Sequence, residues 1–461
     1  MARLLRRCGA RRVRDAPTSD VERALQCVGE SDSKVRAYVH VFADRARAEA
    51  ERRHREIARG PLHGLPFAAK EVFDVAGVET AGGCRAFAGR IPGRDATVIE
   101  RLRTQGAVLI GTQVSHELTC GLDQPPTRNP WNLGCYPGGS SAGAGVSVAV
   151  GSAMFALGTD AAGSVRIPAA MTGVVGFKPT IGCVSKSGIM RQASAPSIDN
   201  VGIVARNAHL VAQVMAAIAG PDPGDVQTLF HPPPLPQESA LKMALRGRRF
   251  ATFGERTVAA LDAIYAREPD VIAAFDRACR QFCDAGAEPV VIEVPGIGDA
   301  IQAIVTLFST ELAFAHRDHL QAKLGSYNPD VSAMLQAALA TPAGPIADAT
   351  AVRARLRKDV DAAISEAGAD FLITPTTPRA AMALASFNPR TELATLIPYT
   401  CLFNLTGHPA ASVPNGMTDG GLPIGLQIVG KHYRDHEVLE IAELFENLNA
   451  PTDFSKIPLS S

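Results

Sequence analysis

The chain has 461 residues, with 46 Lys and Arg against 46 Asp and Glu, so its formal net charge is zero. It therefore lacks the basic field on which nucleic-acid binding relies, and a hydrophobic fraction of 46% is too high for a disordered protein. Nine scattered cysteines without a CxxC pair favour reduced thiols in a cytoplasmic protein over a disulfide framework. No run of 18 apolar residues predicts a membrane span. The basic residues 1–20 lack the apolar core of a secretory signal and are expected to form a poorly ordered tail.

The first part of the chain alternates between helical and extended patterns. Helices are predicted where the sequence is Ala-rich or opens with an Asp cap: at 34–59, 95–104 and 142–151. Buried strands are predicted where apolar residues run without a break: up to Lys70, at 106–112 and at 153–159. A loop rich in Pro, Gly and Asn is expected over 125–141.

The same alternation continues in the second half. The Pro-rich residues 221–240 are expected to be a surface excursion inside one domain, because strand patterns resume beyond them. Those later strands are predicted at 248–254, 289–294, 370–375 and 423–430, with helical stretches at 258–287 and 346–367. The pattern predicts a single α/β domain over 1–461, with a central mixed, mostly parallel twisted sheet covered by helices on both faces.

Three segments carry candidate chemistry. Lys70 ends an apolar strand, where an amine is costly unless it is paired, exposed or functional. The glycine-rich residues 137–145 lack the GK[ST] ending of a phosphate-binding loop, and their GxSxG string does not follow a strand as a nucleophile elbow would. In LGTDAAGSVRIPAA (157–170), Ser164 follows a tight turn whose free backbone N–H groups can hold an oxyanion.

Together these segments resemble the amidase signature family of serine hydrolases. The hallmark is the Gly- and Ser-rich stretch at 137–179, PGGSSAGAGVSVAVGSAMFALGTDAAGSVRIPAAMTGVVGFKPT, in which Ser140 and Ser164 are 24 residues apart. The resemblance covers most of the chain, from the helix at 34–59 to GLPIGLQIVG at 421–430. It implies the amidase signature fold.

The resemblance also implies a role for individual residues. Ser164 matches the nucleophile, Ser140 the bridging serine that the family holds through a cis peptide bond, and Lys70 the base. The matching oxyanion-hole donors are the backbone N–H groups of Ala161, Ala162, Gly163 and Ser164, and the matching bracing residues are Asp160, Ser141 and Arg166. Elementary chemistry agrees: a serine hydroxyl needs an adjacent base, and burial makes lysine one by lowering its pKa.

Two departures from the family pattern bear on the substrate. Ala162 replaces a usual Gly and adds a Cβ beside the oxyanion, so the fit of the acyl group is expected to change while catalysis survives. The segment 112–130 is short, which suggests a wider pocket mouth. The residues expected to line the pocket are Thr119, Cys120 and Gly121 on the acyl side, and Ile189, Met190 and parts of 300–345 at the rim.

The sequence therefore predicts an amidohydrolase that cleaves a linear C–N bond in a small-molecule amide, anilide or carbamate (a urethanase activity). Water completes the reaction by hydrolysing an acyl-enzyme on Ser164, and esters are expected as side substrates. No cofactor or metal is expected, because the histidine pairs 316/319 and 432/436 come without HExxH or an evident third ligand, and His408 is expected to be structural.

No nucleic-acid or membrane partner is expected, and the chain is expected to be a monomer or homodimer. Two alternatives stay open. The first is the A subunit of a tRNA-dependent amidotransferase, against which the short segment 121–130 and the absence of a basic bias speak. The second is a catalytically dead binding protein on the same scaffold, against which the intact Lys70, Ser140 and Ser164 argue.

Overall fold

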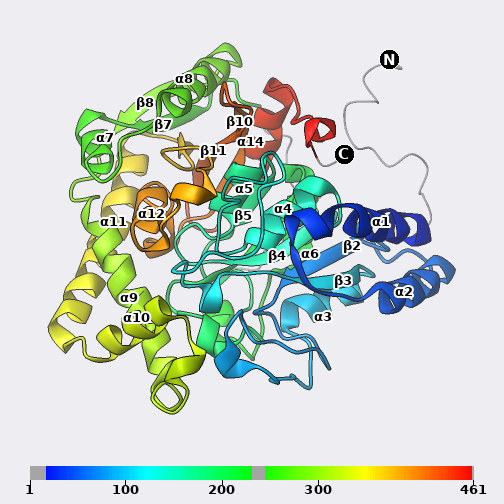
Figure 1. The fold of residues 1–461 in the computed structure, drawn as a ribbon. Helices are drawn as coiled ribbons and strands as arrows, with labels where there is room; N and C mark the ends of the chain where they lie inside the picture. The colour runs from blue at the N-terminus through cyan, green and yellow to red at the C-terminus, as the bar shows by residue number, and fades with distance from the viewer. Residues whose placement is uncertain (1–16, 231–243, 459–461) are drawn as a thin grey trace, which may run out of the picture.

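The computed structural model describes residues 17–230 and 244–458 (Figure 1). These residues build one eleven-stranded sheet in the order β1-β3-β2-β4-β6-β5-β10-β11-β9-β7-β8. Its strands are β1 (Tyr38–Val41), β2 (Pro66–Lys70), β3 (Val108–Gln113), β4 (Phe155–Asp160), β5 (Val175–Lys178), β6 (Asn200–Ala205), β7 (Arg249–Phe253), β8 (Glu288–Ile292), β9 (Phe371–Pro375), β10 (Ala410–Met417) and β11 (Pro423–Gly430).

The sheet mixes parallel and antiparallel neighbours. Strand β2 runs parallel to β3 and β4, and β7 runs parallel to β8 and β9. The other six neighbour pairs in the described sheet are antiparallel. The predicted α/β fold with a mixed sheet is confirmed, but its parallel share is smaller than expected. One reason is the short connection between β10 and β11, since only antiparallel strands can be joined so directly.

Helices cover both faces of this sheet (Figure 1). Helices α4 and α5 pack on the face to which Ala156 and Val204 point, and α6 and α14 pack on the face of Leu157 and Ile203. The described helices are α1 (Pro17–Val35), α2 (Ala43–Arg55), α3 (Thr97–Thr104), α4 (Ala142–Val150), α5 (Arg166–Thr172), α6 (Ala208–Ile218), α7 (Glu255–Asp262), α8 (Pro269–Asp284), α9 (Asp299–His316), α10 (Pro329–Leu339), α11 (Ala343–Glu366), α12 (Pro389–Leu396), α13 (Cys401–Leu405) and α14 (Asp435–Leu448).

The N-terminal part departs from the sequence prediction. The helix predicted over 34–59 is wrong at its start, because α1 ends at Val35, Arg36 turns with a φ of 52°, and strand β1 precedes α2. Helix α1 also includes residues 17–20 of the expected tail, while residues 1–16 lie outside the described residues. The sequence missed β1 because its four residues are too few to show a period.

Two other local predictions need correction. Asp95 does not cap α3, whose N-cap is Ala96; its carboxylate instead accepts the Ala76 amide at 2.8 Å and pairs with Arg103. The helical stretch at 258–287 divides into α7 and α8. Residues 231–243 of the Pro-rich excursion lie outside the described residues. Across the described ranges, no helix is long and apolar enough to cross a membrane.

Candidate active site

Three side chains meet at one edge of the sheet. Lys70 ends β2 and Thr159 lies near the end of β4, so these parallel neighbours carry both residues to the same edge. Ser140 comes from the loop that enters α4. The Lys70 Nζ donates to Ser140 Oγ at 2.7 Å and to Thr159 Oγ1 at 3.0 Å. The structure therefore brings two of the predicted catalytic residues into direct contact and adds Thr159, which the sequence analysis missed.

The environment of Lys70 favours the neutral amine. Its side chain is fully buried, and burial lowers its pKa from the usual 10.5 to about 7, against the opposing charges of Asp199, Asp160, Glu71 and Cys120. At pH 7 about half of such an amine is uncharged. A lysine in this state can accept a proton, which an exposed lysine does not do at neutral pH.

Two buried carboxyl groups near Lys70 were not singled out from the sequence. Burial raises the pKa of Asp199 to about 6 and that of Glu71 to about 7. The Asp199 carboxylate accepts the Ala195 amide at 2.6 Å, which fixes its position. The sequence offered one signal for Glu71, because this carboxyl group directly follows Lys70 in an apolar segment. Asp199 lies in a loop, and no sequence pattern there would have revealed a buried carboxyl group.

The turn that carries Ser140 is held tightly. The Gly139–Ser140 peptide bond is cis, as the resemblance implied. Gly138 has a φ of 83°, and a Cβ there would lie 2.5 Å from the Pro168 Cα, so only glycine fits. The Ser141 amide donates to the Ser164 carbonyl at 3.1 Å, which places residue 164 directly against this turn. The Ser141 hydroxyl donates to the Thr159 carbonyl at 3.2 Å and thus braces the turn.

Exposure increases along the series Lys70, Ser140 and Ser164. Lys70 is fully buried, Ser140 is 2% exposed and Ser164 is half-buried. Within the described part of the chain, the Ser164 hydroxyl forms no hydrogen bond. The structure thus forms the Lys70–Ser140 contact but not a Ser140–Ser164 hydrogen bond, and such contacts often tighten only when substrate binds.

The turn after β4 offers backbone donors beside Ser164. The Asp160 carboxylate accepts the Gly163 amide at 2.7 Å and the Val165 amide at 3.1 Å. Gly163, predicted as an oxyanion donor, therefore has its N–H committed to Asp160. The amides of Ala161, Ala162 and Ser164 bond to no other described residue, so they are the donors available to an oxyanion. Ala162 has a negative φ, and its departure from glycine needs no strained backbone.

A buried ion pair fixes this turn. Arg166, at the start of α5, bonds to both carboxylate oxygens of Asp160, at 2.9 and 3.0 Å. Although burial acts to raise it, the pKa of Asp160 is held well below its usual range by the guanidinium. Asn404 of α13 donates to the Asp160 carbonyl at 2.7 Å and also bonds to Arg166. Breaking such a buried pair costs about 3–5 kcal/mol, so the network stabilises the geometry of the turn.

The residues predicted to line the pocket belong either to its acyl side, at 119–121, or to its rim, at 189–190. Thr119 has a φ of 64°, and buried Cys120 is close enough to Lys70 to influence its pKa. A Cβ on Gly121 would lie 3.0 Å from Leu393, so α12 contributes an apolar wall there. Met190 does not lie at an exposed rim; it is completely buried and belongs to the main core, while its neighbour Ile189 is half-buried.

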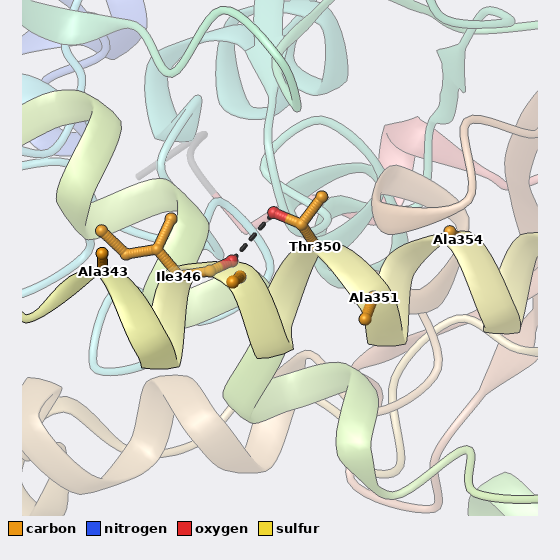
Figure 2. A pocket seen from close by; sticks show the side chains of 6 residues that line it. Ala343, Ile346, Thr350, Ala351 and Ala354 are labelled. Atoms are coloured by element: carbon orange, nitrogen blue, oxygen red, sulfur yellow. Dashed lines mark hydrogen bonds between the residues drawn. The ribbon is translucent and has the colours of Figure 1, made fainter.

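A shallow apolar depression of about 530 Å³ lies elsewhere, along α11 (Figure 2). Its lining comes from one helix: Ala343, Ile346, Ala347, Thr350, Ala351 and Ala354. The only side-chain hydroxyl, that of Thr350, donates to the Ile346 carbonyl at 2.8 Å (Figure 2). The depression contains none of Lys70, Ser140 or Ser164 and has no group suited to chemistry.

The fold and the Lys70–Ser140 contact fit the amide-hydrolase class that the motifs indicated. The family model described as Amidase matches residues 20–439, and the chain belongs to the amidase family. The chain is 31% identical over 448 residues to the A subunit of glutamyl-tRNA(Gln) amidotransferase from Geobacter sp. (strain M21), with 90% of each chain covered. It is 34% identical over 462 residues to the corresponding protein of Synechococcus sp. (strain CC9605), with 92% of each covered.

Similar solved structures support the same family assignment. Native peptide amidase from Stenotrophomonas maltophilia superposes with a TM-score of 0.81 at 29% identity, over 95% of both chains. A chain from a vestigial complex connected with the evolutionary origins of an s-triazine catabolic enzyme gives a TM-score of 0.85 at 28% identity, over 95% of this chain and 96% of that one. The family and fold expected from the sequence are thereby confirmed.

Proposed function

We propose that this amidase-family protein hydrolyses a linear C–N bond with Ser164 as nucleophile, Ser140 as proton bridge and Lys70 as base. The observation that carries the proposal is the 2.7 Å contact between the Ser140 hydroxyl and an amine whose pKa burial lowers to about 7. A base whose pKa lies near the working pH is present to a large extent in its neutral form and still binds a proton well.

The reaction follows from the arrangement. Ser164 attacks the carbonyl carbon as its proton moves to Ser140, and the Ser140 proton moves to neutral Lys70. The free amides of Ala161, Ala162 and Ser164 stabilise the oxyanion, and a single such donor can contribute roughly 2.7–4 kcal/mol to the transition state. The proton then returns through Ser140 to the leaving nitrogen, and the C–N bond breaks. Water attacks the acyl-enzyme by the same route and releases the acid.

The surroundings of the site favour a neutral substrate. The wall near Gly121 is formed by Leu393, and the half-buried Ile189 is apolar. We therefore propose aryl or alkyl amides, anilides and carbamates as substrates over charged ones, with ester cleavage as a side activity. Thr119, Cys120 and Gly121 form the acyl side of the proposed pocket. The protein acts as a monomer or homodimer without a cofactor in this proposal.

A second candidate function comes from the comparisons. The similarity of 31–34% to the amidotransferase proteins covers about nine-tenths of the chain. Under this hypothesis, the same catalytic groups would operate inside a complex with other proteins. The short segment 121–130 and the neutral net charge favour an enzyme that works alone.

One experiment separates these hypotheses. The purified chain is assayed alone against amides, anilides, carbamates and esters, and in parallel it is treated with a fluorophosphonate, followed by peptide mass spectrometry. We expect turnover of at least one neutral amide-type substrate and labelling of Ser164. Labelling of Ser164 without turnover would favour the amidotransferase component, whereas loss of both would favour a binding protein. Labelling at Ser140 or Ser141 instead would overturn the proposed nucleophile.

A further inference from the structure

A second polar cluster lies beside helix α11. Asp361 comes from α11, His408 from the turn between α13 and β10, and His432 from the turn after β11. One ligand-type atom of each residue lies within 4.8 Å of the other two. The His408 and His432 ring centroids are 4.0 Å apart. None of these residues has a part in the proposed reaction.

The hydrogen bonds around Thr406 allow a tautomer of His408 whose Nε2 is free to bind an ion. The Thr406 hydroxyl donates to the Leu402 carbonyl at 2.9 Å, so its oxygen is left to accept. It lies 2.8 Å from the His408 Nδ1, which donates to it when the hydroxyl proton points to Leu402. In a neutral ring, the Nε2 of His408 then carries a lone pair, and this atom lies 3.1 Å from the Asp361 Oδ1.

His432 is oriented by the same residue. Its Nε2 lies 2.9 Å from the Thr406 backbone carbonyl, which can only accept, so Nε2 carries the proton. The Nδ1 of a neutral His432 then carries a lone pair, and it lies 3.3 Å from the same Asp361 oxygen. Two imidazole lone pairs and a carboxylate oxygen thus converge.

With the His408 proton on Nδ1, two imidazole lone pairs and a carboxylate oxygen face one another, and a positive charge between them would bind all three. A second proton on His408 would create a charge on a fully buried ring, which is unfavourable. Protonating both rings, whose centroids are 4.0 Å apart, would add repulsion between like charges. A metal ion removes the conflict, because it accepts all three electron pairs at once.

We propose that Asp361, His408 and His432 bind a divalent transition-metal ion, with zinc preferred by this donor set. Tetrahedral ligands at about 2.0–2.1 Å from zinc lie roughly 3.3–3.4 Å apart, close to the two nitrogen–oxygen separations in the cluster. The Asp361 side chain is 45% exposed, which leaves room for water as a fourth ligand. Thr406 holds the other nitrogen of both rings, as outer partners of metal-bound histidines usually do.

The position of the cluster indicates a structural role. The ion would tie α11 to the end of α13, and α13 carries Asn404, which bonds to the Asp160 turn. Metal would therefore stabilise the frame behind the candidate active site without touching the reacting atoms. The expectation of a metal-free chain missed this cluster because Asp361 lies 47 residues before His408, outside any short ligand motif.

The test uses the full chain after dialysis against a chelator. Zinc content is measured by mass spectrometry after one equivalent of zinc is added and the protein is desalted, and the thermal midpoint is recorded with and without zinc. Cobalt(II) serves as a spectroscopic probe. We expect one bound zinc, a raised midpoint, and a tetrahedral cobalt spectrum without the near-ultraviolet band of thiolate ligands, since the site contains no cysteine.

Two variants and a matched control localise the site. Asp361→Asn and His432→Gln should bind zinc about 100-fold more weakly or worse, and zinc should no longer raise their thermal midpoints. His436→Gln changes a neighbouring histidine outside the cluster and should behave as the wild type. Failure of the wild type to retain zinc, or undiminished binding by both cluster variants, would overturn the proposal. A thiolate band with cobalt would also overturn it, because the ion would then be held by cysteines.

Discussion

The Nζ of Lys70 and the Oγ of Ser140 lie 2.7 Å apart although 70 residues separate them in the sequence. The contact depends on the parallel pairing of β2 with β4 and on the fixed turn before α4. Lys178 is equally buried, but its amine donates to the Pro179 carbonyl at 2.9 Å and forms no hydrogen bond with Ser140 or Ser164. The geometry therefore selects Lys70 as the proposed base between two buried lysines.

The first prediction concerns pH. Because burial lowers the pKa of Lys70 to about 7, kcat/KM should rise with pH through a limb centred near 7 and then level off. Lys70→Met should lose about 10³-fold in kcat/KM, and so should Lys70→Arg, since a guanidinium stays protonated. Lys178→Met serves as the control and should retain the limb. Near wild-type kcat/KM in Lys70→Arg would show that Lys70 is not the base.

The second prediction separates the serines. Ser164→Ala should abolish turnover and fluorophosphonate labelling, because the nucleophile is gone. Ser141→Ala should retain measurable activity, since the Ser141 hydroxyl only braces the turn through the Thr159 carbonyl. Active-site titration with the fluorophosphonate measures both variants. If Ser141→Ala lost all labelling while remaining folded, the assigned roles would have to be exchanged.

The third prediction links Lys70 to stability. The folded chain binds this proton with a pKa of about 7, whereas the unfolded chain binds it with the usual 10.5. Between these values the unfolded state holds more protons, so the Lys70 contribution to stability increases with pH, with a slope approaching about 1.4 kcal/mol per pH unit. Wild type should therefore gain stability relative to Lys70→Met as pH rises from 7 to 10.

Chemical denaturation of the two proteins at each pH checks this prediction. Lys178 titrates in the same range in both proteins, so its contribution cancels in the difference. A difference that stayed constant from pH 7 to 10 would mean that Lys70 keeps its ordinary pKa in the folded state.

The sequence predicts features that neighbouring residues determine, and it does not predict those that depend on how distant segments pack. Lys70, Ser140 and Ser164 could be proposed as catalytic residues because short local motifs carry them. Strands β5, β6 and β10 were missed because glycine, proline or polar residues interrupt their apolar residues. Thr159 and Asp199 were missed because their positions depend on how distant strands and loops pack. The turn proposed to hold the oxyanion was picked out from the sequence, but the bond from the Gly163 amide to Asp160 depends on side-chain geometry that no spacing reveals.

The last prediction tests the turn after β4 by substituting two neighbouring residues, Gly163 and Ala162. Gly163 has a φ of 124°, and a Cβ there would lie 2.4 Å from the Thr400 Oγ1, which donates to the Ala162 carbonyl. Gly163→Ala should therefore displace the turn, cost about 1–3 kcal/mol in stability and reduce kcat about 10²-fold or more by misplacing oxyanion donors. Ala162→Gly is the matched control: Ala162 has a negative φ, so kcat should stay within a few-fold while KM for bulky acyl groups changes. Steady-state kinetics and thermal unfolding of both variants measure these effects. Wild-type kcat in Gly163→Ala would show that this turn does not position the oxyanion donors.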